Sequence, residues 1–160
     1  MEIIYREAEL SDIDALIRLR LEFLELNRGN KLTKDETKAI TAQLCDYIPR
    51  EIGKNFIVCL AEINGEVVSS AYMAVAEKPA NTSFITGKSA TVLNVFTYLP
   101  YRRRGIATQL MKMLIERAAT MQISLLELSA TQSGKFLYEK LGFTRKENSN
   151  YTPMKLELLF

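Results

Sequence analysis

Hydrophobic residues recur along this chain with two spacings, one typical of amphipathic helices and one typical of strands. Apolar residues three and four positions apart predict a helix over residues 11–27 and a second over residues 33–49. Both ranges open on a pair of residues with capping-box spacing, Ser11 with Asp14 and Thr33 with Glu36. A helical hairpin is therefore expected near the N-terminus.

Apolar runs of strand length surround these helices. Residues 2–7 predict a first strand, and residues 56–63 and 66–76 predict two more. Asn64-Gly65 lies between the last two runs, and this dipeptide between apolar segments is the strongest short-range signal for a hairpin. A further strand is predicted over residues 91–97, after a polar loop.

The second half of the chain alternates between the two patterns. Helical spacing predicts a helix over residues 104–121 and a short one over residues 133–141, with a strand over residues 124–131 between them. Residues 143–146 and 153–160 predict two final strands, the last because Met154, Leu156, Leu158 and Phe160 alternate with other residues. The element order indicates an α/β layered domain with a mixed sheet of about seven strands and four flanking helices.

Composition supports one domain over residues 1–160. The chain has 160 residues, of which 48% are hydrophobic, enough for a core of its own. A net charge of +2 argues against a general nucleic-acid-binding protein. The N-terminus lacks the apolar segment of a signal peptide, and no apolar run is long enough for a membrane span, so we expect a cytoplasmic protein without membrane contact.

The residue types also limit the chemistry. Histidine is absent, which removes the most common general base and the most common transition-metal ligand. Cys45 and Cys59 are far apart and lie in apolar surroundings, so we expect reduced core cysteines and no metal site. A nucleophilic Ser-His-Asp or Cys-His site is excluded in its usual form.

The most informative segment is Arg102-Arg103-Arg104-Gly105-Ile106-Ala107, between the strand at 91–97 and the helix that follows. N–H groups at a helix N-terminus lack intrahelical partners, and the helix dipole favours an anion there. Glycine lets an anion approach the backbone, and the arginines add positive charge. The segment predicts a phosphate site.

Two motifs carry a resemblance to a known family. Arg102 to Ala107 contain the order Arg-x-x-Gly-x-Ala, which resembles the acyl-CoA pyrophosphate loop of the GNAT superfamily of N-acetyltransferases. Leu137-Tyr138-Glu139-Lys140-Leu141-Gly142-Phe143 is similar to the C-terminal signature of that family. The resemblance covers residues 90–143 most closely, and the element order extends it over the chain. It implies a GNAT-like domain with a mostly antiparallel sheet.

The resemblance implies acetyl-CoA as co-substrate and a primary amine of a small molecule or peptide as acceptor. Tyr138 would be the catalytic acid that protonates the leaving CoA thiolate, because a phenol is neutral at pH 7 and can donate a proton. Backbone groups at the end of the 91–97 strand would contact pantetheine, and one N–H there could stabilise the oxyanion. The expected cofactor-binding residues are Val95, Phe96, Thr97, Arg102, Arg103, Arg104, Gly105, Ile106, Ala107, Thr108 and Thr131.

Two positions depart from the family pattern. Leu99 stands where the family often has proline, with Pro100 one residue later, and Thr131 stands where asparagine often contacts pantetheine. The sequence does not identify the general base, which is either a carboxylate such as Glu77 or a water molecule.

The alternative is a non-catalytic acyl-CoA-binding or regulatory domain, and a nucleic-acid-binding module is disfavoured. The identity of the acceptor, the use of an acyl group other than acetyl, and a homodimeric state remain open.

Overall fold

The computed structural model describes residues 1–147 and 150–160, which form two compact units, Met1–Ser129 and Ala130–Phe160. The first unit contains a five-stranded sheet in the order β1-β2-β3-β4-β5. Its strands are β1 (Ile4–Glu7), β2 (Phe56–Ile63), β3 (Glu66–Glu77), β4 (Lys88–Thr97) and β5 (Leu125–Glu127). The first four strands pair antiparallel and β5 pairs parallel with β4, so the predicted mixed, mostly antiparallel sheet is confirmed.

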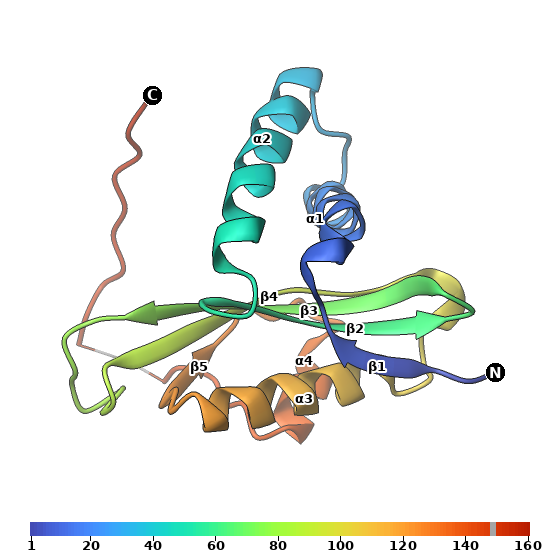
Figure 1. The fold of residues 1–160 in the computed structure, drawn as a ribbon. Helices are drawn as coiled ribbons and strands as arrows, with labels where there is room; N and C mark the ends of the chain where they lie inside the picture. The colour runs from blue at the N-terminus through green and yellow to red at the C-terminus, as the bar shows by residue number, and fades with distance from the viewer. Residues whose placement is uncertain (148–149) are drawn as a thin grey trace. The chain divides into compact units, whose positions relative to one another are not determined.

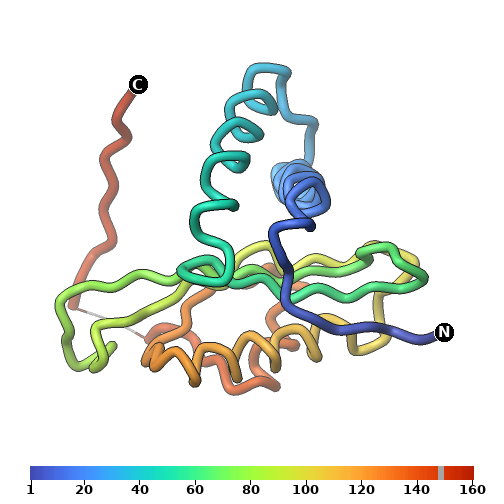
Figure 2. Tube along the Cα trace, in the orientation of Figure 1, coloured from blue at the N-terminus to red at the C-terminus, as the bar shows by residue number. Residues whose placement is uncertain are grey.

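Helices cover both faces of this sheet. The helices α1 (Ile13–Arg28) and α2 (Lys34–Glu51) lie on one face, and α3 (Ile106–Thr120) lies on the other (Figures 1 and 2). The apolar face of α3 packs against the sheet, and its buried residues are Ile106, Leu110, Met111, Leu114 and Ala118. None of the helices in the described part of the chain is both long enough and apolar enough to span a membrane.

The two predicted helix starts have different outcomes. The Thr33–Glu36 capping box is confirmed, since the Glu36 N–H donates to Thr33 Oγ1 at 3.1 Å and the Thr33 N–H donates to Glu36 Oε2 at 2.8 Å. The expected cap at Ser11 is wrong, because Leu10–Asp12 form a 3₁₀ turn and Glu9 pairs with Asp12 in the capping box instead.

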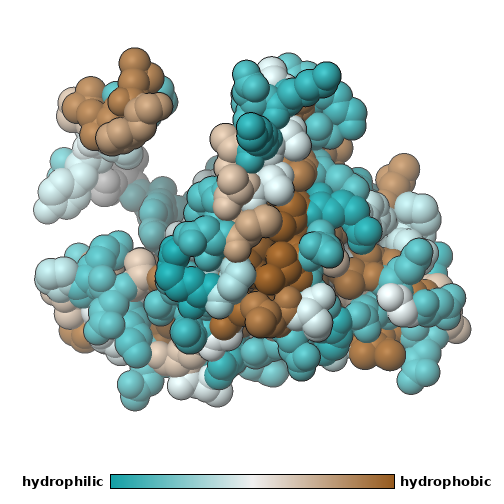
Figure 3. Space-filling view, turned by 45° about the horizontal axis from the view of Figure 1, so that its top comes forward, coloured by the Kyte–Doolittle hydropathy of each residue, from teal (hydrophilic) through white to brown (hydrophobic). Residues whose placement is uncertain are grey.

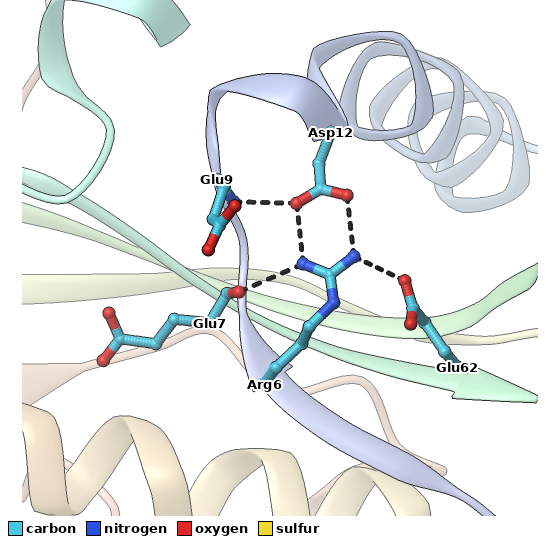
Figure 4. Close-up of polar contacts among 5 residues, drawn as sticks. All are labelled: Arg6, Glu7, Glu9, Asp12 and Glu62. Atoms are coloured by element: carbon cyan, nitrogen blue, oxygen red, sulfur yellow. Dashed lines mark hydrogen bonds and ion pairs between the residues drawn. The ribbon is translucent and has the colours of Figure 1, made fainter. Parts of the chain in front are cut away.

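A tertiary contact explains the shifted start of α1. The guanidinium of Arg6 on β1 donates two hydrogen bonds of 2.8 Å to the Asp12 carboxylate, one to the carboxylate of Glu62 on β2, and one of 3.2 Å to the Glu7 carbonyl (Figure 4). The Asp12 carboxylate also accepts from the Glu9 N–H at 2.7 Å. This cluster fixes the turn between the first strand and α1.

The hairpin between β2 and β3 forms as predicted. Asn64 and Gly65 have φ values of 52° and 81°, and a two-residue turn with both residues left-handed matches the right-handed twist of the adjoining strands. A second irregularity lies between β3 and β4, where Ser70 pairs with Phe96 but Tyr72 pairs with Leu93. One residue of β3 therefore faces two of β4, which is a β-bulge.

The prediction of about seven strands is wrong, because the described residues contain five. Residues 143–146 and 153–160 carry no strand assignment. Alternating side chains give a segment a strand-like pattern, but a strand also needs a neighbour that accepts and donates its backbone hydrogen bonds. The predicted strand over 124–131 is likewise reduced to Leu125–Glu127.

The second unit contains α4 (Lys135–Lys140), shorter than the helix predicted over 133–141. Gly142 follows with φ of 95°, and the Phe143 N–H donates to the Tyr138 carbonyl at 3.0 Å. This is a Schellman ending, so the expected glycine after the helix is confirmed.

Candidate functional site

The candidate site begins where β4 leaves its parallel neighbour. The pairing of β4 with β5 ends at Thr91, opposite Glu127, while β4 itself continues to Thr97. On its other side this part of β4 is still paired with β3, through Val92, Leu93, Phe96 and Thr97. The edge of β4 toward β5 is therefore unpaired over six residues, and these include the predicted pantetheine contacts.

The predicted contacts on β4 are not equally available. The Phe96 carbonyl accepts from Ser69 Oγ at 2.8 Å, and the Thr97 carbonyl accepts from Arg102 Nε at 2.8 Å. The Thr97 hydroxyl lies 2.7 Å from Ser69 Oγ. Val95 is half-buried and belongs to the β-bulge, where it has no register partner on β3. Ser69 on β3 is thus a supporting residue that sequence reasoning missed.

The basic turn after β4 has the backbone geometry of an anion site. A 3₁₀ turn over Leu99–Tyr101 follows β4, and Arg103 and Gly105 then adopt left-handed φ values of 63° and 74°. Gly105 is the N-cap of α3 and makes no side-chain cap. Within the described residues, no backbone N–H from Arg103 to Thr108 donates a hydrogen bond, so the turn offers free donors at the positive end of a helix dipole.

The three arginines of the turn differ in their contacts. Arg102 is held on the Thr97 carbonyl, and Arg104 donates to the Pro100 carbonyl at 3.3 Å and stacks over the Tyr101 ring at 5.9 Å. Arg103 has neither contact and is exposed. Arg103 therefore has the greatest freedom to reach a bound anion, while the other two stabilise the turn.

A cavity of about 640 Å³ opens beside this strand end. Phe96, Tyr98 and Arg102 line it from the β4 side, and Glu22 and Glu25 line it from α1. The Glu25 carboxylate accepts from Lys31 Nζ at 2.8 Å and from the Leu32 N–H at 3.1 Å. Burial raises the pKa of the Tyr98 phenol, and a hydrogen bond with the carboxylate of Glu22 raises it further. The sequence pattern did not single out either glutamate by residue.

Glu77 lies away from this region. It ends β3 opposite Lys88, at the start of β4, and its side chain is exposed. Val95 lies seven positions after Lys88, which corresponds to about 23 Å at the usual rise of ~3.3 Å per residue. The position of Glu77 does not suit a base for chemistry at Val95.

Tyr138 and Thr131 belong to the second unit, Ala130–Phe160. Burial raises the pKa of the Tyr138 phenol, and the ring contacts Phe143 edge-to-face at a centroid distance of 5.9 Å. The Thr131 hydroxyl accepts from the Gly134 N–H at 3.1 Å and lies 3.2 Å from Ser133 Oγ. Thr131 therefore stabilises the turn before α4, a role that the sequence did not suggest.

The described residues, 1–147 and 150–160, contain no group of three Cys, Asp or Glu side chains that could hold a metal ion. Cys59 is buried and Cys45 is exposed, and both are free thiols. The exposure of Cys45 contradicts its expected place in the core.

Comparison with known proteins gives one family match. The model of the acetyltransferase (GNAT) domain matches residues 54–145, which include β2 to α4 and both sequence motifs. No curated protein matches the chain significantly.

Several solved structures share the fold over nearly the whole chain. A predicted acetyltransferase from Clostridium acetobutylicum, solved with acetyl-CoA, is 24% identical, with 96% of each chain covered and a TM-score of 0.80. A GCN5-related N-acetyltransferase from Ralstonia eutropha is 20% identical, with 96% of this chain and 99% of that chain covered and a TM-score of 0.73. Glucosamine-6-phosphate N-acetyltransferase from Arabidopsis thaliana is 18% identical, with 97% and 100% covered and a TM-score of 0.67.

Proposed function

The chain belongs to the GNAT acetyltransferase family, and on that premise we propose that it transfers an acetyl group from acetyl-CoA to a primary amine of a small molecule or peptide. The amine nitrogen attacks the thioester carbonyl directly, the C–S bond breaks, and CoA leaves as a thiolate. The chain's own groups would bind the co-substrate, stabilise the oxyanion and move two protons.

One observation carries this proposal. The free edge of β4 leads directly into a turn with free N–H groups from Arg103 to Thr108. An extended pantetheine arm can pair with an open strand edge, and a pyrophosphate suits the N–H groups and positive dipole of the α3 N-terminus. The structural neighbour solved with acetyl-CoA supports the same assignment.

Tyr138 is the proposed acid. Burial raises the pKa of its phenol, so the group stays protonated at neutral pH, and no other influence on this pKa arises from the described residues. A leaving thiolate, with a conjugate thiol pKa near ~8.5, is stabilised by accepting a proton. Solvent would then reprotonate the tyrosine.

Glu22 is the proposed base. An amine acceptor with a pKa near ~10 is mostly an ammonium ion at neutral pH, so it must lose a proton before attack. Glu22 is half-buried in the cavity beside Phe96, whereas the neighbouring Glu25 carboxylate is engaged by Lys31 and Leu32. A carboxylate in that cavity also attracts the ammonium form electrostatically.

The runner-up is a domain that binds acyl-CoA without turnover. Ordinary strand-edge and helix-terminus contacts would serve such a domain equally well, so cofactor binding alone does not separate the two. Release of free CoA in the presence of a panel of amines supports the enzyme, while saturable acetyl-CoA binding without release supports the binding domain.

Gly105→Ala tests the cofactor site, with Gly53→Ala as matched control. Both glycines have φ near 75° (74° and 75°), and an added Cβ meets nothing within 4 Å at either. Both variants should therefore lose similar stability from backbone strain. Only Gly105→Ala should weaken acetyl-CoA binding, by about tenfold or 1.4 kcal/mol, since its Cβ would crowd the phosphate.

Isothermal calorimetry with acetyl-CoA measures this difference, and thermal melts check the matched stabilities. Equal affinity of both variants and the wild type would refute pyrophosphate binding at this turn. Loss of affinity in Gly53→Ala as well would attribute the effect to strain.

A further inference from the structure

Arg20 on α1 is a partly buried arginine without a carboxylate partner. Its Nη1 donates to Asn94 Oδ1 at 3.3 Å, the single hydrogen bond assigned to it among the described residues. Burial lowers the pKa of this guanidinium, Tyr72 opposes that effect, and no carboxylate contributes. Arginine nevertheless stays charged in proteins and carries five N–H donors, so most of its hydrogen-bonding capacity is unused.

Asn94 is the second polar group at this place, and it is unusual in two respects. It is the left-handed residue of the β4 bulge, with φ of 52°, and it is only 2% exposed. Its Oδ1 accepts from Arg20, while its Nδ2 is buried and has no partner among the described residues. An unsatisfied buried donor costs about 1–3 kcal/mol, and this amide can donate to one further acceptor.

Arg20 also lines a second cavity, of about 520 Å³. Among the described residues that line it, Arg20 is the only charged one, and Leu93, the neighbour of Asn94, lines it from β4. The remaining described lining residues are Leu24, Ala39, Ile40, Gln43, Leu44, Tyr47, Phe56, Tyr72 and Ala74. Figure 3 shows apolar surface bordered by polar surface on the side of the sheet that carries α1 and α2.

The bulge lies between the two cavities along β4, since Leu93 lines the second cavity and Phe96 the first. Consecutive Cα atoms are ~3.8 Å apart, so the backbone of Asn94 adjoins the proposed thioester position at Val95. A small molecule could therefore occupy the second cavity and present its amine there.

We propose that the acceptor carries a carboxylate, bound by the Arg20 guanidinium and Asn94 Nδ2, and an apolar body that fills the second cavity. This inference rests on the acetyl transfer proposed above and names its substrate class, a hydrophobic amino acid or a close analogue. One guanidinium matches one carboxylate in charge and bidentate geometry, whereas no second cation lines the described cavity to balance a phosphate dianion.

A purely structural role for the pair explains less. A tie between α1 and β4 would need only the bond between Arg20 and Asn94 Oδ1, and a neutral residue would provide it without burying a charge. Such a tie leaves Asn94 Nδ2 and the remaining N–H donors of the Arg20 guanidinium without acceptors among the described residues. A bound carboxylate satisfies both groups at once.

The test uses amine pairs that differ only in the carboxylate: L-leucine with 3-methylbutylamine, and L-phenylalanine with phenethylamine. Removal of a charged hydrogen-bond partner should lower kcat/KM for the amino acids by about 10- to 100-fold in Arg20→Met. The decarboxylated amines should change less than about threefold. Met preserves much of the apolar volume of arginine and removes the buried charge, so the variant should fold.

Two further variants complete the test. Lys112→Met replaces an exposed cation on α3, on the other face of the sheet from Arg20, and should leave all four rates unchanged. Aspartate also tolerates a left-handed backbone, so Asn94→Asp should fold. Its carboxylate would form an ion pair with Arg20, so this variant should also lose the preference for acceptors that carry a carboxylate. A direct readout is the thermal shift given by L-leucine or L-phenylalanine, expected for the wild type and absent in Arg20→Met.

The outcomes separate the two proposals. Turnover of amines without any preference for the carboxylate would overturn the substrate class and leave acetyl transfer intact. Failure of acetyl-CoA to bind would overturn acetyl transfer, and the thermal shift would still decide the carboxylate site. Absence of both a shift and a preference, or a larger shift with phosphoethanolamine than with the amino acids, would overturn the carboxylate assignment.

Discussion

Arg6 and Arg20 both place a guanidinium partly inside the first unit, but the protein satisfies them in opposite ways. Arg6 donates to two carboxylates and a carbonyl from neighbouring segments, whereas Arg20 has one amide oxygen at 3.3 Å. A guanidinium with its charge neutralised internally supports the fold. A guanidinium without a counter-charge, in the lining of an apolar cavity, has hydrogen-bond donors available to a ligand.

The basic turn before α3 is a third arginine environment. There the arginines are exposed, and charges in water contribute little each. The free backbone N–H groups, rather than the arginine charges, give that turn its directional donors. We therefore propose three roles for these three arginine environments: fold support, acceptor binding and co-substrate attraction.

The largest expected effect separates chemistry from binding. If Arg6 supports the fold and Arg20 binds the acceptor, neither supplies the proton for the leaving thiolate. Tyr138→Phe keeps the ring contact with Phe143 and removes the donor. General acid catalysis contributes about 10²- to 10⁴-fold, so kcat should fall by that factor while acetyl-CoA affinity stays within about twofold.

Rapid-quench kinetics with a confirmed acceptor, under conditions where chemistry limits the rate, measures the fall in kcat. Tyr151→Phe, in the same unit, is the matched control and should keep its rate. A Tyr138→Phe enzyme with wild-type kcat would show that water or another group protonates the thiolate.

The next expected effect concerns the opposite charge on α1. Glu22 follows Arg20 by two residues on α1, but the two side chains line different cavities, so we propose separate roles for them. Glu22→Gln should lower kcat/KM about 100-fold at pH 7. The deficit should shrink as pH rises toward the amine pKa near ~10, because free amine then needs no base.

A pH profile of kcat/KM checks this expectation. Glu25→Gln is the control, since its carboxylate lines the same cavity but is held by Lys31. A deficit in Glu22→Gln that stays constant with pH would indicate an electrostatic role rather than proton transfer.

The smallest expected effect tests the fold-supporting arginine. Hydrogen bonds from Arg6 lower the pKa of the Asp12 carboxyl. A lowered folded-state pKa gives stability that is present above the unfolded value of ~3.9 and is lost as pH falls below it. Asp12→Asn should therefore reduce the free energy of unfolding by about 2 kcal/mol at pH 7. Between pH 7 and pH 3, the free energy of unfolding should fall less in this variant than in the wild type.

Urea denaturation at pH 7 and pH 3 measures both quantities. Asp14→Asn, at an exposed position of α1, should change stability by less than about 0.5 kcal/mol. An equal loss in the two variants would contradict the assigned role of the Arg6 cluster. A measurable change in acetyl-CoA affinity would contradict its separation from the site.

Local sequence determined much of the fold and the cofactor turn. Asn64-Gly65 specified the β2–β3 hairpin, Thr33 with Glu36 specified the start of α2, and Gly142 specified the end of α4. Each depends on backbone conformations and side-chain bonds within a few residues, which a local pattern records. The turn around Gly105 was predictable for the same reason, since its left-handed φ and free N–H groups are local properties.

Tertiary structure decided the rest. The contact of Asp12 with Arg6 moved the start of α1, and the lack of pairing partners left five strands among the described residues. The glutamates of the first cavity, the orphan amide of Asn94 and the unpaired charge of Arg20 were not visible in the sequence. Residues 20 and 94 lie 74 positions apart, and only the packing of α1 on the β4 bulge brings them within hydrogen-bonding distance.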